Sequence, residues 1–101
     1  MSVYIFDAVR TPRGKGRPDG SLAGVTPSRL VGQLVRALEA RNGMAAVHAA
    51  EHFTLGCVTQ SGVQGGHIAL ASRIQAGLPD TMAALTINNF CVSGLSALAD
   101  A

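Results

Sequence analysis

The chain has 101 residues and a net charge of +2, and at this length folding buries only about two-thirds of the surface that the unfolded chain exposes. Hydrophobic residues make up 48% of the sequence, but the longest apolar runs are far shorter than the ~20 residues that cross a bilayer, so we expect no membrane partner. With no Trp, one Tyr and three Phe, the chain has few side chains for stacking on bases, so nucleic acid is not an expected partner either.

The first predicted element is a strand over residues 3–9, VYIFDAV. Its apolar side chains alternate onto both faces, a pattern typical of a strand covered on both sides. The segment has no basic region ahead of a long apolar core and no small-residue cleavage site. We therefore interpret it as a strand and not as a signal peptide.

Residues 11–25 are rich in Gly, Pro and charge, and they are long for a connection inside a compact domain. We expect an exposed loop there. Most of the excess positive charge lies in or beside this loop, at Arg10, Arg13, Lys15 and Arg17. The pattern predicts a solvated basic loop; the alternative is contact with an anionic partner, such as a phosphate-bearing cofactor or a neighbouring subunit, and four charges do not decide between them.

A helix is predicted from Thr26, as the N-cap, and Pro27, as the first helical position, to the left-handed end at Asn42 and Gly43. Apolar residues recur on one face of it: Leu30, Val31, Leu34, Val35 and Leu38. We interpret this stripe as core and not as a cofactor site. Residues 44–51 have helical propensity, and residues 52–58 are predicted to be a second strand.

Residues 61–66 are predicted to form a glycine-rich turn, residues 67–76 a helix and residues 82–88 a third strand, with a further helix from about Cys91 or Val92. That helix has no C-cap signal, so we expect the chain to stop inside an element. The alternation of strands and helices predicts an α/β fold with right-handed β-α-β units, a mainly parallel sheet and helices on both faces. Binding and catalytic sites in such sheets usually lie beyond the carboxyl ends of the strands, and Cys91 is predicted to lie at such an end.

The two cysteines, Cys57 and Cys91, are far apart and form no C-x-x-C unit, so we expect neither a zinc site nor a redox pair. No metal site is expected elsewhere. A disulfide between the two cysteines is possible but lacks support. Free thiols and the absence of a signal peptide favour a cytoplasmic location.

Cys91 is a candidate nucleophile. A thiol becomes reactive where positive potential favours the thiolate, and the start of a helix supplies this through free backbone N–H groups. The same groups can stabilise an oxyanion on an attacked carbonyl. The alternative is a packing cysteine, and Cys57, which we place inside a strand, is expected to be core. Ser93 and Gly94 in the first helical turn allow another backbone or a substrate to approach closely.

Over almost its whole length the sequence resembles the start of the thiolases, the family of acetyl-CoA acetyltransferases and 3-ketoacyl-CoA thiolases. The C-x-S-G-L step from Cys91, after the strand end TINN, is the specific part, and the opening DAVRTPRG corroborates it. The resemblance implies that residues 1–101 are a partial thiolase N-terminal domain. It also implies that Cys91 accepts an acyl group from an acyl-CoA, for thiolysis of a 3-ketoacyl-CoA or for Claisen condensation, with its N–H in an oxyanion hole.

The resemblance implies coenzyme A thioesters as substrates, no bound cofactor and a homo-oligomeric full-length protein. The family also has a second half with a histidine in a G-H-P step and a cysteine in a C-x-G-G step. None of His48, His52 and His67 has that context, and Cys57 is followed by Val-Thr-Gln. We therefore expect the chain alone to be inactive, and we assign no coenzyme A contacts. His67 is expected to be a solvated or hydrogen-bonded residue at a helix start, or to contact a partner subunit.

Two alternatives remain. A decarboxylating condensing enzyme that acts on carrier-bound malonyl groups also places a cysteine at a helix start, although the VRTP opening favours a thiolase. The other is a truncated, non-catalytic remnant or an interaction domain of thiolase fold.

Overall fold

Two of the predicted strands pair in the computed structural model, which describes residues 1–101. β1 (His52–Gly56) and β2 (Ala83–Ile87) form a parallel two-stranded sheet, in register from His52 opposite Ala83 to Gly56 opposite Ile87. Parallel neighbours require a crossover connection, and the helix between them in sequence provides it. Both strands lie inside the predicted ranges. The α/β class is therefore confirmed.

The helices begin and end close to the predicted positions. α1 (Pro27–Asn42) starts with Pro27 in its first turn, and α2 (Met44–His48) follows directly. Gly43 separates them with a φ of 89°, a value that favours glycine. Thr26 occupies the N-cap position, but its side chain makes no capping hydrogen bond.

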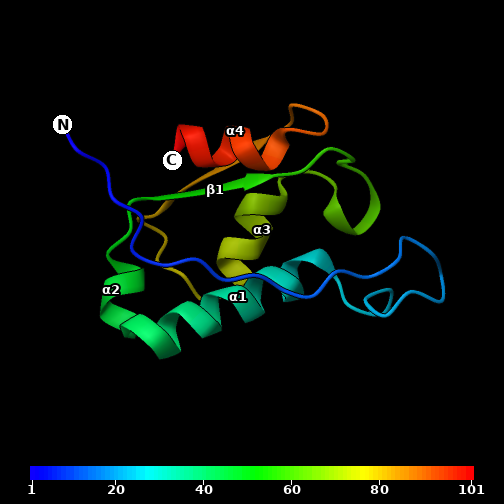
Figure 1. Ribbon diagram of the computed structural model, residues 1–101, viewed down its shortest axis with the longest axis horizontal. Coiled ribbons are helices and arrows are strands. Elements are labelled where there is room, and N and C mark those ends of the chain that lie inside the picture. The colour runs from blue at the N-terminus through cyan, green and yellow to red at the C-terminus, as the bar shows by residue number, and fades with distance from the viewer.

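Between the strands the chain forms a short 3-10 turn, η1 (Gly62–Gln64), and then α3 (Ile68–Gln75). α4 (Ser93–Asp100) follows β2. α3 and α4 both contact the two strands and lie on opposite sides of the sheet, as Figure 1 shows, while α1 packs against α3. Helices therefore cover both faces of the sheet, as predicted.

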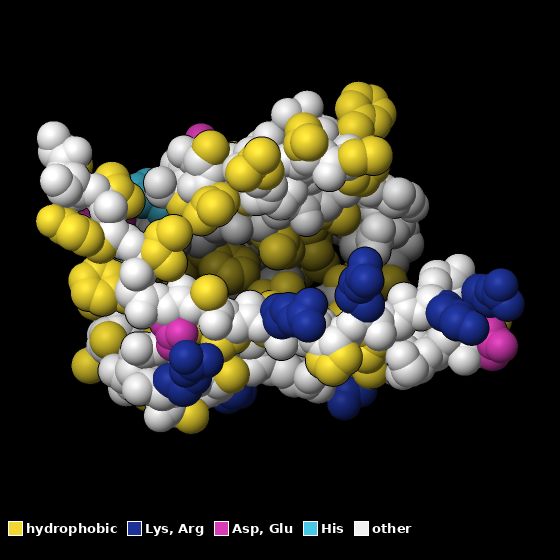
Figure 2. Space-filling view, viewed as in Figure 1, with side chains coloured by type: hydrophobic (Ala, Val, Ile, Leu, Met, Phe, Trp, Pro, Cys, Tyr) yellow, Lys and Arg dark blue, Asp and Glu magenta, His cyan; other side chains and the backbone are white.

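The core is small and lies between α1, α3 and the sheet. Only 9 of the 101 residues are buried. The main cluster consists of Val35 from the predicted apolar stripe with Ala76, Leu78 and Met82, and Phe53 of β1 packs against it. Many large apolar side chains stay exposed, and Figure 2 shows them along the upper part of the molecule. The protein therefore has a modest core and an extensive apolar surface.

The strand predicted over residues 3–9 is wrong for this structure. These residues form no regular secondary structure and pair with no strand. Figure 1 shows the segment passing beside α1, and Asp7 fixes it there through a hydrogen bond from Asn42 (2.9 Å) and an ion pair with Arg41 (2.8 Å). A strand is stable only when its backbone groups find partners, and this segment is held by a side chain instead.

The loop over residues 11–25 is mostly exposed, as predicted, and contains only bends and turns. None of its cationic side chains, nor that of Arg10, forms an ion pair within the protein. No helix of the structure has the length and apolar character that crossing a membrane requires.

Candidate functional site

Cys91 lies in the turn that joins the carboxyl end of β2 to α4, the orange segment in Figure 1. Its side chain is exposed and it forms no disulfide. The helix begins later than predicted, at Ser93, with Val92 in the N-cap position. Cys91 therefore precedes the helix and is presented to solvent by the turn.

Side chains of the turn itself hold its shape. The carboxamide oxygen of Asn88 accepts a hydrogen bond from the N–H of Phe90 (3.0 Å), and the Asn89 side chain donates one to Ser96 Oγ (2.9 Å). Phe90, directly before the cysteine, has a φ of 48° and is the one non-glycine residue with a positive φ. A bulky residue in the left-handed region is strained, and such strain persists only where the surroundings enforce it.

The start of α4 offers unpaired backbone donors beside the thiol. The N–H groups of Cys91, Gly94 and Leu95 have no acceptor within the protein. These groups and the positive end of the helix dipole make this an electropositive position on an otherwise apolar helix. An oxygen that develops negative charge next to the Cys91 sulfur finds hydrogen-bond donors on this side.

Gly56, the last residue of β1, lets the start of α4 lie close to the strand. A Cβ at this position would be 2.7 Å from the backbone of Ser93 and 2.9 Å from the N of Gly94, closer than real contacts allow. Only glycine fits without a shift of the helix. The strand predicted over residues 52–58 includes this glycine, but the sequence did not reveal the contact that requires it.

Cys57 does not lie inside a strand as predicted, because β1 ends at Gly56. It follows the strand at the same edge of the sheet as Cys91, and its N–H donates to the carbonyl of Ile87 (2.9 Å). Its thiol is half-buried and donates to the carbonyl of Thr59 (3.7 Å). Both cysteines are free, and no group of three or more His, Cys, Asp or Glu side chains is placed to hold a metal ion.

His67 is the N-cap of α3, so the prediction that it is a hydrogen-bonded residue at a helix start is confirmed. Its Nδ1 accepts a hydrogen bond from the N–H of Leu70 (3.3 Å) and lies 2.8 Å from Thr86 Oγ1 of β2. Because Nδ1 already accepts from Leu70, the Thr86 hydroxyl is the donor in that contact. This ring therefore joins α3 to the strand that leads to Cys91, and it makes no hydrogen bond to the thiol.

The other histidines lie away from the cysteine turn. His52 is exposed at the first residue of β1, the end of the sheet opposite Cys91. His48 lies at the end of α2, where its Nε2 is 3.8 Å from a carboxylate oxygen of Glu39. His67 and His48 therefore bond to other groups, and His52 lies at the far end of the sheet, so none of the three is placed beside the Cys91 thiol.

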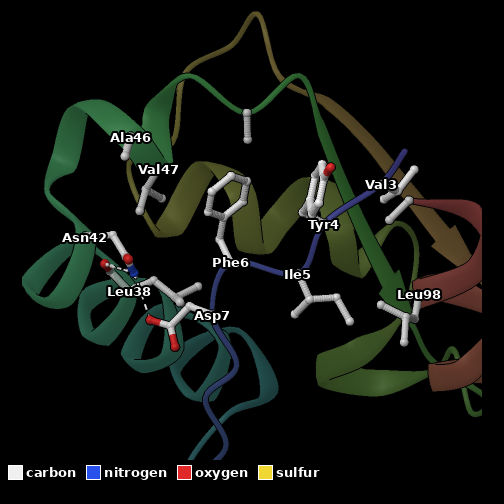
Figure 3. Close-up of a pocket in the computed structure, with 12 residues that line it drawn as sticks. Val3, Tyr4, Ile5, Phe6, Asp7, Leu38, Asn42, Ala46, Val47 and Leu98 are labelled. Atoms are coloured by element: carbon white, nitrogen blue, oxygen red, sulfur yellow. Dashed lines mark hydrogen bonds between the residues drawn. The ribbon is translucent and has the colours of Figure 1, made fainter. Parts of the chain in front are cut away.

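A cavity of about 710 Å³ lies away from Cys91. It lies between the N-terminal segment, the last turns of α1, α2 and the far end of α4, and Figure 3 shows Phe6, Leu38, Val47 and Leu98 around it. Most of its lining is apolar. Since α4 begins beside Cys91 and ends at this cavity, the cavity is at the opposite end of the helix from the cysteine.

The sequence identified Cys91 and its position between strand and helix, but it missed the groups that shape the turn. Phe90 carries no sign of a left-handed conformation, because aromatic residues rarely adopt it. Ser93 was noted only for its small size, whereas its hydroxyl is almost buried against the turn. Asn88 gives the one available signal, since asparagine side chains often bond to backbone groups two residues on.

The sequence matches the family described as "Thiolase, N-terminal domain" over residues 3–101. It is 45% identical over 96 residues to a 3-ketoacyl-CoA thiolase of Alcanivorax borkumensis, covering 95% of this chain and 24% of that protein. It is 40% identical over 99 residues to a beta-ketoadipyl-CoA thiolase of Pseudomonas knackmussii, covering 98% of this chain and 24% of the relative.

A 3-ketoacyl-CoA thiolase of Photobacterium profundum is 36% identical over 100 residues, which are 99% of this chain and 26% of that protein. The chain thus spans about a quarter of the length of the curated relatives it matches. The family match includes the cysteine turn, both strands and all four helices. The chain therefore belongs to the thiolase family of acyltransferases.

Proposed function

We propose that this chain supplies the nucleophile of a thiolase reaction and that Cys91 is the residue that accepts the acyl group. The observation that carries the proposal is the position of the Cys91 thiol, exposed at the carboxyl end of β2 beside unpaired N–H groups at the start of α4. Membership of the thiolase family supplies the reaction class.

In the first half-reaction the Cys91 thiolate attacks the 3-keto carbonyl of a 3-ketoacyl-CoA. The carbonyl oxygen becomes an oxyanion, which the unpaired N–H groups of Cys91 and Gly94 are suited to stabilise. The bond between C2 and C3 then breaks. Its electron pair leaves on C2 as the enolate of acetyl-CoA, and this enolate takes up a proton. The acyl group remains on sulfur as a thioester.

In the second half-reaction the thiol of coenzyme A loses its proton and attacks the acyl-Cys91 carbonyl. The new thioester forms as the bond to Cys91 breaks, which regenerates the thiolate. The reverse sequence is Claisen condensation. Both directions need a group that moves protons, and the hydrogen bonds of His67 and His48 go to Thr86, Leu70 and Glu39 and not to the Cys91 thiol. We therefore propose that residues 1–101 alone accept one acyl group on Cys91 but do not complete a catalytic cycle.

The test is labelling of the folded chain by a small alkylating agent at neutral pH, with Cys57 as an internal reference. Peptide mass mapping should find Cys91 labelled at least about tenfold faster, because its thiol is exposed beside unpaired backbone N–H groups whereas Cys57 is half-buried. Incubation with an acetyl-CoA excess should place an acetyl group on Cys91, and C91S should remove it while C57S retains it. Equal, slow labelling of both cysteines contradicts the proposal and favours the non-catalytic remnant.

The decarboxylating condensing enzyme is distinguished by its substrate. A carrier-bound malonyl group would have to bind next to Cys91 and lose carbon dioxide, whereas a thiolase uses coenzyme A thioesters. Acylation by acetyl-CoA, without any response to a carrier-bound donor, supports the thiolase assignment. The opposite preference would support the condensing enzyme.

A further inference from the structure

The hydroxyl of Ser93 occupies the inside of the turn that presents Cys91. Its Oγ accepts a hydrogen bond from the N–H of Asn89 (2.9 Å) and donates one to the carbonyl of Phe90 (2.6 Å). Ser93 is only 5% exposed, so solvent does not compete for these bonds. One side chain thus bonds to the residues directly before the cysteine.

The bonded segment contains the strained residue of the turn. Phe90 has a φ of 48°, and its carbonyl accepts hydrogen bonds from both the hydroxyl and the N–H of Ser93. Together with the side chain of Asn88, which accepts from the Phe90 N–H, these bonds oppose relaxation of Phe90 to a negative φ, which would rotate the peptide that carries Cys91. The Phe90 side chain is 73% exposed, so its packing does not hold the conformation.

Ser93 itself is fixed by its surroundings. It is the first residue of α4, and the close approach of Gly56 places β1 against its backbone. A side chain whose own backbone is fixed between helix and strand can transmit that rigidity to the turn. This links the α4 packing on the sheet to the position of the thiol.

We propose that Ser93 is a positioning residue, whose hydroxyl holds Phe90 in its left-handed conformation and thereby keeps the Cys91 thiol at the N-terminus of α4. The inference rests on the proposed function, because it assigns a partner to the same nucleophile. Ser93 does not touch the substrate, and it acts through the backbone of Asn89 and Phe90.

The test compares S93A with S96A in the 101-residue chain, with Cys57 labelling as the measure of intact folding. The Ser96 hydroxyl accepts a hydrogen bond from the Asn89 side chain but bonds to no backbone group of the turn, so S96A is a matched serine control one turn further along α4. S93A should slow alkylation of Cys91 by about 3- to 10-fold, the effect of one or two lost hydrogen bonds, while S96A changes it by less than about twofold. Faster hydrogen exchange at the Asn89 amide should accompany the S93A effect.

A second-site substitution separates positioning from a general loss of structure. Glycine adopts a positive φ without strain, so adding F90G to S93A should restore much of the Cys91 alkylation rate. Adding F90A instead removes the same side chain but keeps the strain, and it should restore nothing. Rescue by both substitutions, or by neither, overturns the positioning role.

The proposed function can fail separately from this inference. If the wild-type chain labels Cys91 no faster than Cys57, the nucleophile assignment fails. If the wild type shows the preference and S93A keeps it unchanged, only the role of Ser93 is wrong.

Discussion

Residues 3–9 and β1 were both predicted to be strands, but only β1 forms one, although residues 3–9 are the more apolar of the two. β1 pairs along its whole length with β2, and its Phe53 packs against the core. The N-terminal segment finds no strand, and Phe6 is 93% exposed. An apolar pattern therefore indicates that a segment is able to form a strand. Whether the strand forms depends on whether another strand is available to pair with it.

The two regions also differ in what fixes them. Around Cys91 the backbone N–H groups of Phe90 and Asn89 donate to the side chains of Asn88 and Ser93, and Gly56 makes a close contact with the start of α4. At the N-terminus a single carboxylate, that of Asp7, ties the chain to α1 beside a large apolar cavity. The backbone of the candidate site is therefore fixed by several contacts, whereas the segment that borders the cavity is fixed by one side chain.

The strongest destabilisation is expected on substitution of Phe53 in β1. F53A should lower the free energy of unfolding by about 2–3 kcal/mol, since it removes a half-buried ring from the cluster of Val35, Leu78 and Met82. F53L should cost about 1 kcal/mol or less, because it keeps most of the packing. Urea denaturation measures both. A loss of less than about 0.5 kcal/mol in F53A would mean that the sheet is no better packed than the N-terminal segment.

The next effect tests the contact between β1 and α4. G56A should destabilise the protein by about 1–3 kcal/mol, because the new methyl group would meet the backbone of Ser93 at 2.7 Å. G32A is the control: a Cβ at Gly32 meets nothing within 4 Å, and alanine inside α1 should stabilise by about 0.5–1 kcal/mol.

Thermal unfolding compares the two glycine variants, and cysteine labelling reports the site. G56A should also slow alkylation of Cys91 as α4 moves away from the strand. Equal stability of G56A and the wild type would show that the helix start adapts freely. The turn would then be less rigid than its hydrogen bonds indicate.

Local signals in the sequence predicted most of the fold. The Thr26-Pro27 step, the apolar stripe of α1 and Gly43 placed that helix almost to the residue. β2 and the position of Cys91 after it were also predicted, because a strand end followed by helical spacing is a local pattern. What failed was non-local: whether residues 3–9 have a partner depends on contacts that no residue in the segment encodes.

The candidate site shows the same division. The cysteine and its place before a helix could be read from residue types, and the family resemblance is confirmed by the match over residues 3–101. The left-handed Phe90, the hydroxyl of Ser93 and the clash at Gly56 could not be read, because each arises from backbone geometry between elements. Such features become visible only when strand and helix are placed together.

A smaller effect concerns the ion pair of the N-terminal segment. The hydrogen bond from Asn42 lowers the pKa of Asp7 below its ordinary value of 3.8, helped by the N–H of Ala8 and by Arg41. Because the pKa is lowered in the folded state, ionised Asp7 stabilises the folded protein above about pH 3.8. This stabilisation is lost as the pH falls below that value. D7N should remove this pH dependence.

Hydrogen exchange of the Ala8 amide, which donates to Asp7 (2.8 Å), is the measurement. In the wild type the exchange protection should fall as the pH passes below the ordinary carboxyl pKa, after correction for intrinsic rates. The labelling of Cys91 should not follow this transition. A parallel change at both positions would contradict the separation of the two regions.

The smallest effect is expected at Phe6, and it is the most direct comparison with Phe53. F6A should change the free energy of unfolding by less than about 0.5 kcal/mol, because an exposed ring contributes little to stability. A loss near that of F53A would mean that residues 3–9 pack in solution as the strand that their sequence predicts. The stability of F6A therefore distinguishes an N-terminal segment that stays unpaired in solution from one that packs as a strand.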